Sequence, residues 1–259
     1  GQGILTAGQG DEDAVLLDLT DKTLDLNGFT YHFGYACHFT GSNGTIKNGA
    51  MTIDDNSNDT WALAVNGPYA DHFTIDGVTL NKGILIQHGT DVQLNDLTVT
   101  TPERNDAAAV QINGGCSATI TGGSYTISTG DDAAHADGDL TVSGGTLDIQ
   151  ASYEGLEGGT VTVSGGDITA VSSDDALNAA GGNDGSGFGG HGMGNTFTPG
   201  GNSSAITITD GTIQMLAGGD GLDSNGSIEM TGGTVVVCST GGGDGALDYE
   251  SSFTLDGGI

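Results

Sequence analysis

Basic residues are scarce in this sequence. The 259 residues include 4 lysines and arginines against 34 aspartates and glutamates, so the formal net charge is −30. Such a chain repels phosphate backbones and anionic membranes, which argues against nucleic acid as a partner. The expected partners are cations, neutral polymers that bind through stacking and hydrogen bonds, or acidic polymers bridged by metal ions.

Long apolar runs and cysteine pairs are also missing. No stretch of 18 apolar residues occurs, so no membrane insertion is predicted. Cys37, Cys116 and Cys238 are too few and too far apart for a disulfide framework, and no C-x-x-C pair indicates zinc. We expect all three to be small buried hydrophobic residues. No signal peptide is recognisable, and we expect the sequence to be a mature or excised segment of a larger surface protein.

Glycine, by contrast, is abundant, with 49 residues, and it follows a period. A strand-like run, a Gly-Gly or Asp-Gly pair and a second strand-like run recur, as in LTVSGGTLDI at 140–149 and VTVSGGDITA at 161–170. The second glycine of this phrase stands at 123, 145, 166, 211 and 233, which gives steps of 22, 21, 45 and 22 residues. The long step contains a Gly-rich, low-complexity stretch at 181–204, which we interpret as an insertion loop.

This period predicts an all-β fold. Steps of 21–22 residues with two short β-branched strands each, and no helical pattern, indicate a right-handed single-stranded parallel β-helix, or β-solenoid. We expect one domain over 1–259 with about ten coils, stacked about 4.8 Å apart into a rod on the order of 50 Å long. A two-sheet sandwich is the competing all-β fold, but it does not explain the constant step.

Acidic residues follow the same period in two columns. The first acidic column lies nine residues after the second glycine and contains Asp132, Glu154, Asp175 and Asp220, with Asp244 beside the equivalent position in the last repeat. The second acidic column lies three residues further on and contains His135, Glu157, Asn178, Asp223 and Asp248. Between the columns, a leucine recurs that we expect to anchor each turn in the core: Leu156, Leu177, Leu222 and Leu247.

Carboxylates held one coil apart repel one another by several kcal/mol in a partly desolvated groove, at roughly 4.8 Å and an intermediate dielectric. One solution is full solvation, since Asp-Gly turns are common in β proteins without any metal. The other is a hard cation between them, and Ca²⁺ accepts six to eight oxygen ligands. Five turns in register favour calcium, although no EF-hand loop is present. The candidate ligands are Asp131, Asp132, Asp137, Asp139, Glu154, Glu157, Asp174, Asp175, Asn178, Asp220, Asp223, Asp244 and Asp248. In the coil of His135 we expect a site to use Asp131, Asp137 and Asp139 in place of the histidine.

The segments GDDAAHADGDLTVSGGTLDIQASYEGLEGGTVTVSGG, AGGDGLDSNGSIEMTGGTVVV and GALDYESSFTLDGG carry a resemblance. They resemble a family of bacterial cell-surface carbohydrate-binding domains, over roughly residues 119–258. The resemblance implies a pectate-lyase-like, calcium-binding parallel β-helix that binds cellulose and acidic sugars and is not known as a lyase. It also implies an extracellular location, secreted or attached to the cell surface. The first 118 residues share only the general style of such helices.

The sequence offers little for catalysis. Lyases of this fold use an arginine or lysine as the base, and here Arg104 is the single arginine, in a predicted loop. Hydrolysis would need paired aspartates, and the pairs fall in the repeat register, with Asp174 and Asp175 the best remaining candidates. We therefore predict no catalytic residues.

Carbohydrate binding needs aromatic faces or polar grooves. Trp61, Tyr153 and Tyr249 are the candidate sugar-binding aromatics, although each is as readily explained as a stacked core or turn residue. A non-catalytic polysaccharide-binding module is the favoured function. A calcium-dependent lyase or hydrolase acting on pectin-like polymers and a passive adhesin stalk are the alternatives.

Overall fold

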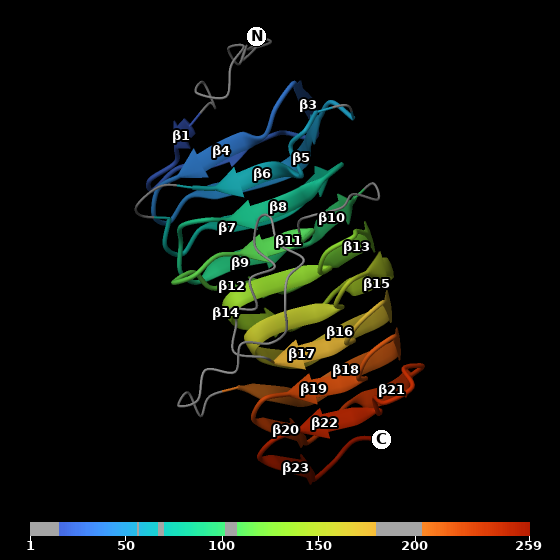
Figure 1. Ribbon diagram of the computed structural model, residues 1–259. Helices are drawn as coiled ribbons and strands as arrows, with labels where there is room; N and C mark the ends of the chain where they lie inside the picture. Colours follow the sequence, from blue (N-terminus) through green and yellow to red (C-terminus); the bar gives the residue numbers. More distant parts are fainter. Residues whose placement is uncertain (1–15, 56, 67–69, 102–107, 180–203) are drawn as a thin grey trace.

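The computed structural model describes residues 16–55, 57–66, 70–101, 108–179 and 204–259. The predicted insertion, except Ser204, and Arg104 lie outside these residues. The described chain is all β and contains no helix, and its strands stack as a β-solenoid of about nine turns (Figure 1). Every strand pair in it is parallel, which confirms the solenoid and excludes the antiparallel sandwich.

The strands form three ladders. The first ladder consists of β1 (Leu16–Asp18), β4 (Cys37–Thr40), β6 (Trp61–Val65), β8 (Gly83–Ile86), β11 (Val110–Ile112), the start of β14 (Ala134–Val142), the start of β16 (Leu156–Ser172), β17 (Leu177–Ala179), β19 (Leu222–Ser224) and β22 (Leu247–Tyr249). The second ladder consists of β2 (Thr23–Asp25), the start of β5 (Thr45–Ile53), the start of β7 (Thr74–Leu80), β9 (Val92–Asn95), β12 (Ala118–Ile120), the end of β14, the middle of β16, the start of β18 (Ala205–Ala217), β20 (Ser227–Met230) and β23 (Ser252–Leu255).

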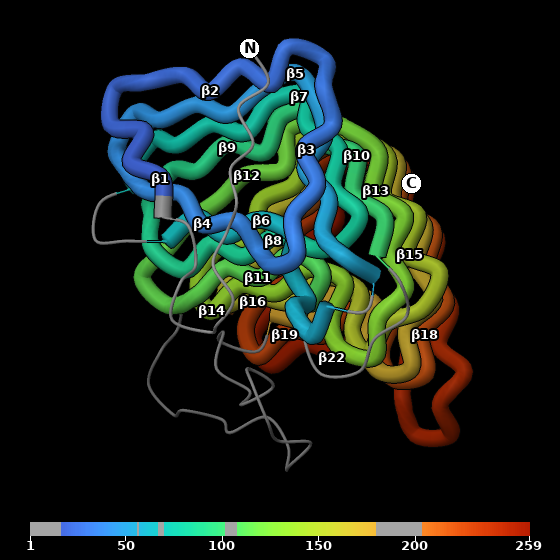
Figure 2. The backbone as a smooth tube through the Cα atoms, turned by 90° about the horizontal axis from the view of Figure 1, so that it is seen from above, coloured from blue at the N-terminus to red at the C-terminus, as the bar shows by residue number. Residues whose placement is uncertain are grey.

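The third ladder consists of β3 (Thr30–Phe33), the ends of β5 and β7, β10 (Leu97–Thr100), β13 (Gly123–Ser128), β15 (Thr146–Ser152), the ends of β16 and β18, and β21 (Thr234–Ser239). Viewed along the axis, the ladders occupy three sides of the coil, marked by β4 and β6, by β9 and β12, and by β13 and β15 (Figure 2). The prediction of two strands per coil is therefore wrong. The residues predicted as an acidic turn form the third strand, which is too short and too rich in acidic residues and glycine to be recognised from strand propensity.

Coil length is regular only in part of the chain. Leu156 pairs with Leu177, and 177 − 156 gives the predicted 21 residues. Near the N-terminus Cys37 pairs with Leu63, and 63 − 37 gives 26 residues. The period read from the glycines therefore holds for the coils that contain the Gly-Gly phrase and not for the earlier ones.

Each Gly-Gly pair forms the corner between the second and third ladders. A Cβ atom on Gly165 would lie 2.5 Å from the carbonyl oxygen of Ser143 in the preceding coil, so this position has no room for a side chain. Gly166 has a φ of 97°, a left-handed conformation that L side chains rarely adopt. The repeat therefore carries two glycines because one allows the coils to approach closely and the other turns the chain.

Aliphatic side chains from all three ladders fill the interior. Leu156 and Leu177 are fully buried and Leu222 nearly so, as expected for the predicted leucine ladder, whereas Leu247 on the last coil is 37% exposed. Cys37 and Cys116 are buried, but Cys238 is exposed, because it points outward from β21 where the valines of that strand alternate inward. The expectation of three buried cysteines is thus wrong for Cys238.

Candidate metal centre and carbohydrate-binding face

The second acidic column lies on the outer face of the first ladder, where its members are paired from coil to coil. His135 pairs with Glu157 and Glu157 with Asn178, and the register continues through Asp223 to Asp248. The alignment deduced from the sequence is therefore the register of the structure. Because strand residues alternate between faces, the leucines that precede these residues point into the core.

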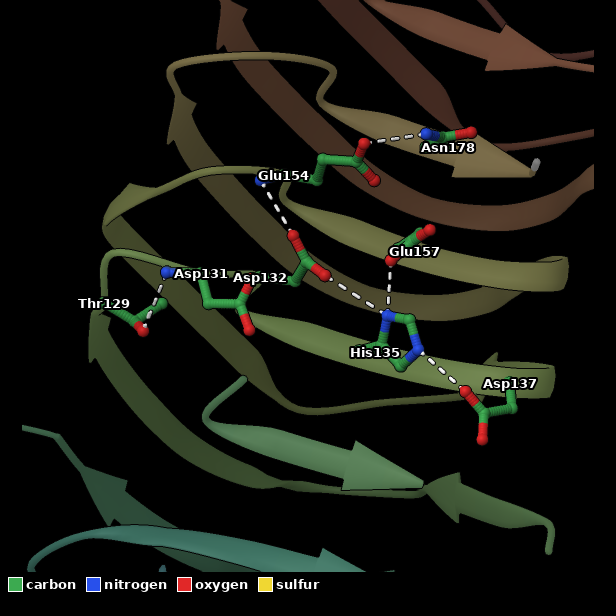
Figure 3. A network of polar contacts seen from close by, with 8 residues as sticks. All are labelled: Thr129, Asp131, Asp132, His135, Asp137, Glu154, Glu157 and Asn178. Carbon is green, nitrogen blue, oxygen red and sulfur yellow. Dashed lines mark hydrogen bonds and ion pairs between the residues drawn. The ribbon is translucent and has the colours of Figure 1, made fainter. Parts of the chain in front are cut away.

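The coil that contains β14 carries a buried cluster around a histidine (Figure 3). His135 Nδ1 lies 3.2 Å from Asp132 Oδ2 and also contacts Glu157 Oε2 of the next coil. On the other side of the ring, Nε2 lies 3.1 Å from Asp137 Oδ1. Asp132, His135 and Glu157 are the one group of three or more possible metal ligands among the described residues, with ligand atoms within 4.8 Å of one another.

Burial and charge act together on this cluster. Burial disfavours the imidazolium, but the three surrounding carboxylates outweigh it and raise the pKa of His135 above its ordinary value. Burial, with the neighbouring Asp132 carboxylate, raises the pKa of Glu157 to about 8, although the His135 contact acts in the opposite direction. Burial and the Glu157 carboxylate likewise raise the pKa of Glu154. The cluster therefore holds more negative charge than its one histidine neutralises.

Glu154 lies beside Asn178, which donates from Nδ2 to Glu154 Oε1 at 2.8 Å (Figure 3). Three buried oxygens in this region have no hydrogen-bond partner: Glu154 Oε2, Glu157 Oε1 and Asn178 Oδ1. Buried polar atoms are usually satisfied, so these oxygens indicate an unfilled need for a donor or a cation.

The first acidic column has a role that the sequence did not reveal. Asp132 Oδ1 accepts a hydrogen bond from the backbone N–H of Glu154 at 3.1 Å. Asp175 Oδ1 accepts one from the N–H of Asp220 at 2.6 Å, and Asp220 Oδ1 one from the N–H of Gly245 at 2.5 Å. These carboxylates therefore join each coil to the next one without any metal.

Towards the C-terminus the columns become more exposed and wholly acidic. Burial, opposed by a backbone hydrogen bond and reinforced by Asp223 and neighbouring aspartates, raises the pKa of Asp175 to about 7. Burial, with the carboxylates of Asp248 and Asp220, raises the pKa of Asp223 to about 6. Asp244 and Asp248 are exposed. The donors gathered in this part of the columns are all oxygens.

The remaining predicted ligands lie at the margin of the columns. Asp139 accepts a hydrogen bond from Thr160 Oγ1 at 2.7 Å, and the backbone N–H of Asp131 points to Thr129 Oγ1 at 3.3 Å. Asp174 lies beside the hydroxyl of Tyr153 and raises its pKa. The ligand group in this coil thus includes His135, which the sequence reasoning had set aside.

The three aromatic candidates differ in exposure. Tyr153 is 39% exposed and Tyr249 43%, and the Tyr249 ring lies 6.0 Å from that of Phe253. Trp61 is half-buried and donates from Nε1 to the carbonyl of Ala108 at 2.9 Å, so its polar edge is already used in the fold.

A groove of about 730 Å³ follows the Gly-Gly corners at the start of the third ladder. One side chain per coil lines it beside the glycines, in the paired order Thr146, Asp167, Thr212 and Thr234. The second outward residue of these strands is exposed too, as Asp148, Thr169 and Gln214 show. A polar, open strip thus runs along the solenoid axis, and the sequence reasoning did not identify it because Thr is also an ordinary strand former.

The basic side chains of the described chain lie away from the columns. Lys82 is buried and donates to the carbonyls of Ser57 and Asp59, and Lys47 lies 3.8 Å from Asp25. Arg104, the candidate base, is outside the described residues.

A family model described as "Carbohydrate-binding domain-containing protein" matches residues 42–155. The match supports a carbohydrate-binding module, and such a family suggests a non-catalytic one. It covers coils from β5 to β15, whereas the resemblance noted in the sequence lies mainly further along the chain. Searches of curated proteins and of solved structures found no match. No helix in the described residues is long and apolar enough to cross a membrane.

Proposed function

We propose that this protein is a non-catalytic module that binds a polysaccharide on the outside of its solenoid. The observation that carries the proposal is the match of residues 42–155 to a carbohydrate-binding family. The surroundings of such polymers imply a secreted or cell-surface location and a place within a larger surface protein. No basic side chain of the described residues stands near the acidic columns, which argues against a lyase.

The groove beside the Gly-Gly corners is the best candidate for the binding face. It is long, polar and open, and it repeats one hydroxyl or carboxylate per coil, about 4.8 Å apart. Glycines leave space there for a flat chain, while Thr146, Thr212 and Thr234 offer donors and acceptors to sugar hydroxyls. An extended glucan or uronate polymer suits such a strip better than a short sugar does.

Calcium is the proposed structural ion of the C-terminal part of the acidic columns. The donor set of Asp175, Asp220, Asp223 and Asp248 consists of oxygens alone, as Ca²⁺ requires. Their mutual repulsion, seen in the raised pKa of Asp175 and of Asp223, is the cost that a cation would remove. When bound, Ca²⁺ would neutralise these carboxylates and could bridge to an acidic polymer, which the net charge of −30 otherwise repels.

The test is retention of the protein on insoluble cellulose and on immobilised polygalacturonate, with and without EGTA. We expect binding without release of soluble or unsaturated sugar products. Retention on cellulose should persist in EGTA while the fold survives, and retention on polygalacturonate should be lost. Product release at turnover rates would make the protein an enzyme, and no retention on any glycan would leave a passive stalk.

A matched pair of triple variants locates the face. Alanine at Thr146, Thr212 and Thr234 removes three groove hydroxyls; alanine at Thr119, Thr141 and Thr162 removes three from the outer face of the second ladder. Three lost hydrogen bonds at about 0.5–1.5 kcal/mol each should weaken binding about tenfold or more in the first variant only. Equal retention of both variants would move the binding face elsewhere.

A further inference from the structure

The buried histidine of the second acidic column faces the wrong partners for a neutral side chain. His135 Nδ1 is directed at Asp132 Oδ2, at 3.2 Å, and at Glu157 Oε2. Its other nitrogen, Nε2, lies 3.1 Å from Asp137 Oδ1. An ionised carboxylate only accepts hydrogen bonds, so the space between Nδ1 and the two carboxylates needs either a proton or a cation.

A second observation favours the cation. His135, Asp132 and Glu157 are 2%, 0% and 0% exposed, and Glu157 Oε1 and the neighbouring Glu154 Oε2 have no hydrogen-bond partner. A proton on Nδ1 adds one positive charge beside three buried carboxylates and leaves both oxygens unsatisfied. Buried charges are normally paired or bound to metal ions, and a divalent ion adds the second positive charge that the proton cannot supply.

We propose that Asp132, His135 and Glu157 bind one divalent transition-metal ion of the zinc class, at a site separate from the calcium columns. One nitrogen and two carboxylate oxygens are a donor set that Zn²⁺ uses, with a fourth position left for water. The site does not suit Ca²⁺, whose ligands are oxygens. The 3.2 Å between Nδ1 and Asp132 Oδ2 is close to the about 3.3 Å that separates two ligands of a tetrahedral Zn²⁺ with bonds of about 2.0 Å.

Asp137 completes the arrangement as a positioning residue. A metal-bound histidine usually donates its other N–H to a carboxylate, which fixes the tautomer and the ring orientation. Asp137 Oδ1 occupies this place on Nε2. Because Asp132 and His135 belong to one coil and Glu157 to the next, the ion would also clamp two neighbouring coils. This inference does not depend on polysaccharide binding.

The test is calorimetric titration of the metal-stripped full chain with Zn²⁺ in excess Ca²⁺, which occupies oxygen-only sites. We expect one equivalent of Zn²⁺ to bind. His135→Asn should bind it at least tenfold more weakly, and Asn should be tolerated because Asn178 fills the equivalent position. Asp137→Asn should lower the affinity about 10–100-fold. His72→Asn is the matched control and should leave it unchanged, since His72 is exposed and contacts Asp91 alone among carboxylates in the described chain.

Absence of a one-equivalent site in the unmodified chain, displacement of Zn²⁺ by equimolar Ca²⁺, or equal affinity in His135→Asn would overturn the proposal. Should His135→Asn fail to fold, anomalous diffraction at the zinc edge from crystals of the unmodified protein decides. A peak beside His135 Nδ1 supports the site, and a peak elsewhere or none refutes it.

Discussion

Asp223→Asn offers a direct test of electrostatic repulsion in the acidic columns. Asp223 is half-buried on β19, and its Cα partner in the preceding coil is already an asparagine, Asn178. The substitution keeps the shape of the side chain and removes one charge. We expect it to stabilise the protein in chelator and to destabilise it in calcium.

The magnitude follows from the titration of Asp223. Its pKa rises from 3.8 to about 6, first through burial and then through Asp248 and Asp220. At about 1.4 kcal/mol per pH unit this corresponds to about 3 kcal/mol of destabilisation at high pH. Solvent screens a half-buried group, so we expect about 1–2 kcal/mol. A raised carboxyl pKa favours folding below the unfolded pKa, and this advantage is lost as pH rises. The gain from Asp223→Asn should therefore be absent below about pH 4, grow to about pH 6 and then stay constant.

Thermal unfolding at pH 4, 6 and 8, in EGTA and in Ca²⁺, measures this effect. In EGTA at pH 8 we expect a Tm higher by about 2–8 °C, given about 2–4 °C per kcal/mol for a chain of this size. In Ca²⁺ the variant should gain less from the ion than the unmodified protein does, because one ligand is missing. Asp148→Asn, on an exposed strand position of the third ladder, is the control and should change little. A lower Tm for Asp223→Asn in EGTA at pH 8 would refute the repulsion argument.

Other predictions address the metal and the coils. EGTA should lower the Tm of the unmodified protein, because an ion bound only by the folded state stabilises it; an unchanged melting curve would count against structural calcium. Leu177→Ala, at a fully buried position between Leu156 and Leu222, should cost about 2–5 kcal/mol in denaturant unfolding. Gly165→Ala places a Cβ 2.5 Å from a backbone oxygen and should destabilise, whereas Gly242→Ala, with nothing within 4 Å, should not.

The period of the glycines was enough to predict the fold because coil stacking imposes it. Gly165 and Gly166 are both required by the corner, one by the approach of Ser143 and one by its left-handed φ. A spacing that has a steric cause at each repeat is read directly from the sequence. The N-terminal coils lack that cause, since positive φ there falls partly on Asn48 and Asp96, and their lengths therefore escaped the prediction.

The acidic columns were predicted in position but not in environment. Residues in register along a solenoid must stack, so the pairing of Glu157 with Asn178 followed from counting. Counting does not say which oxygen meets a backbone N–H, and thus it missed the hydrogen bonds that Asp175 and Asp220 accept. It also treated His135 as a break in the column, although the structure places this residue between two carboxylates of adjacent coils.

The same structural position therefore supports different chemistry along the axis. At one end of the second acidic column a histidine nitrogen is buried among carboxylates, and at the other end Asp248 stands exposed to solvent. A buried nitrogen–oxygen set selects a transition ion, whereas half-exposed oxygen sets select a hard cation that keeps part of its water. The ladder fixes where the ligands stand, and the residue at each rung, together with its burial, decides which ion it can hold.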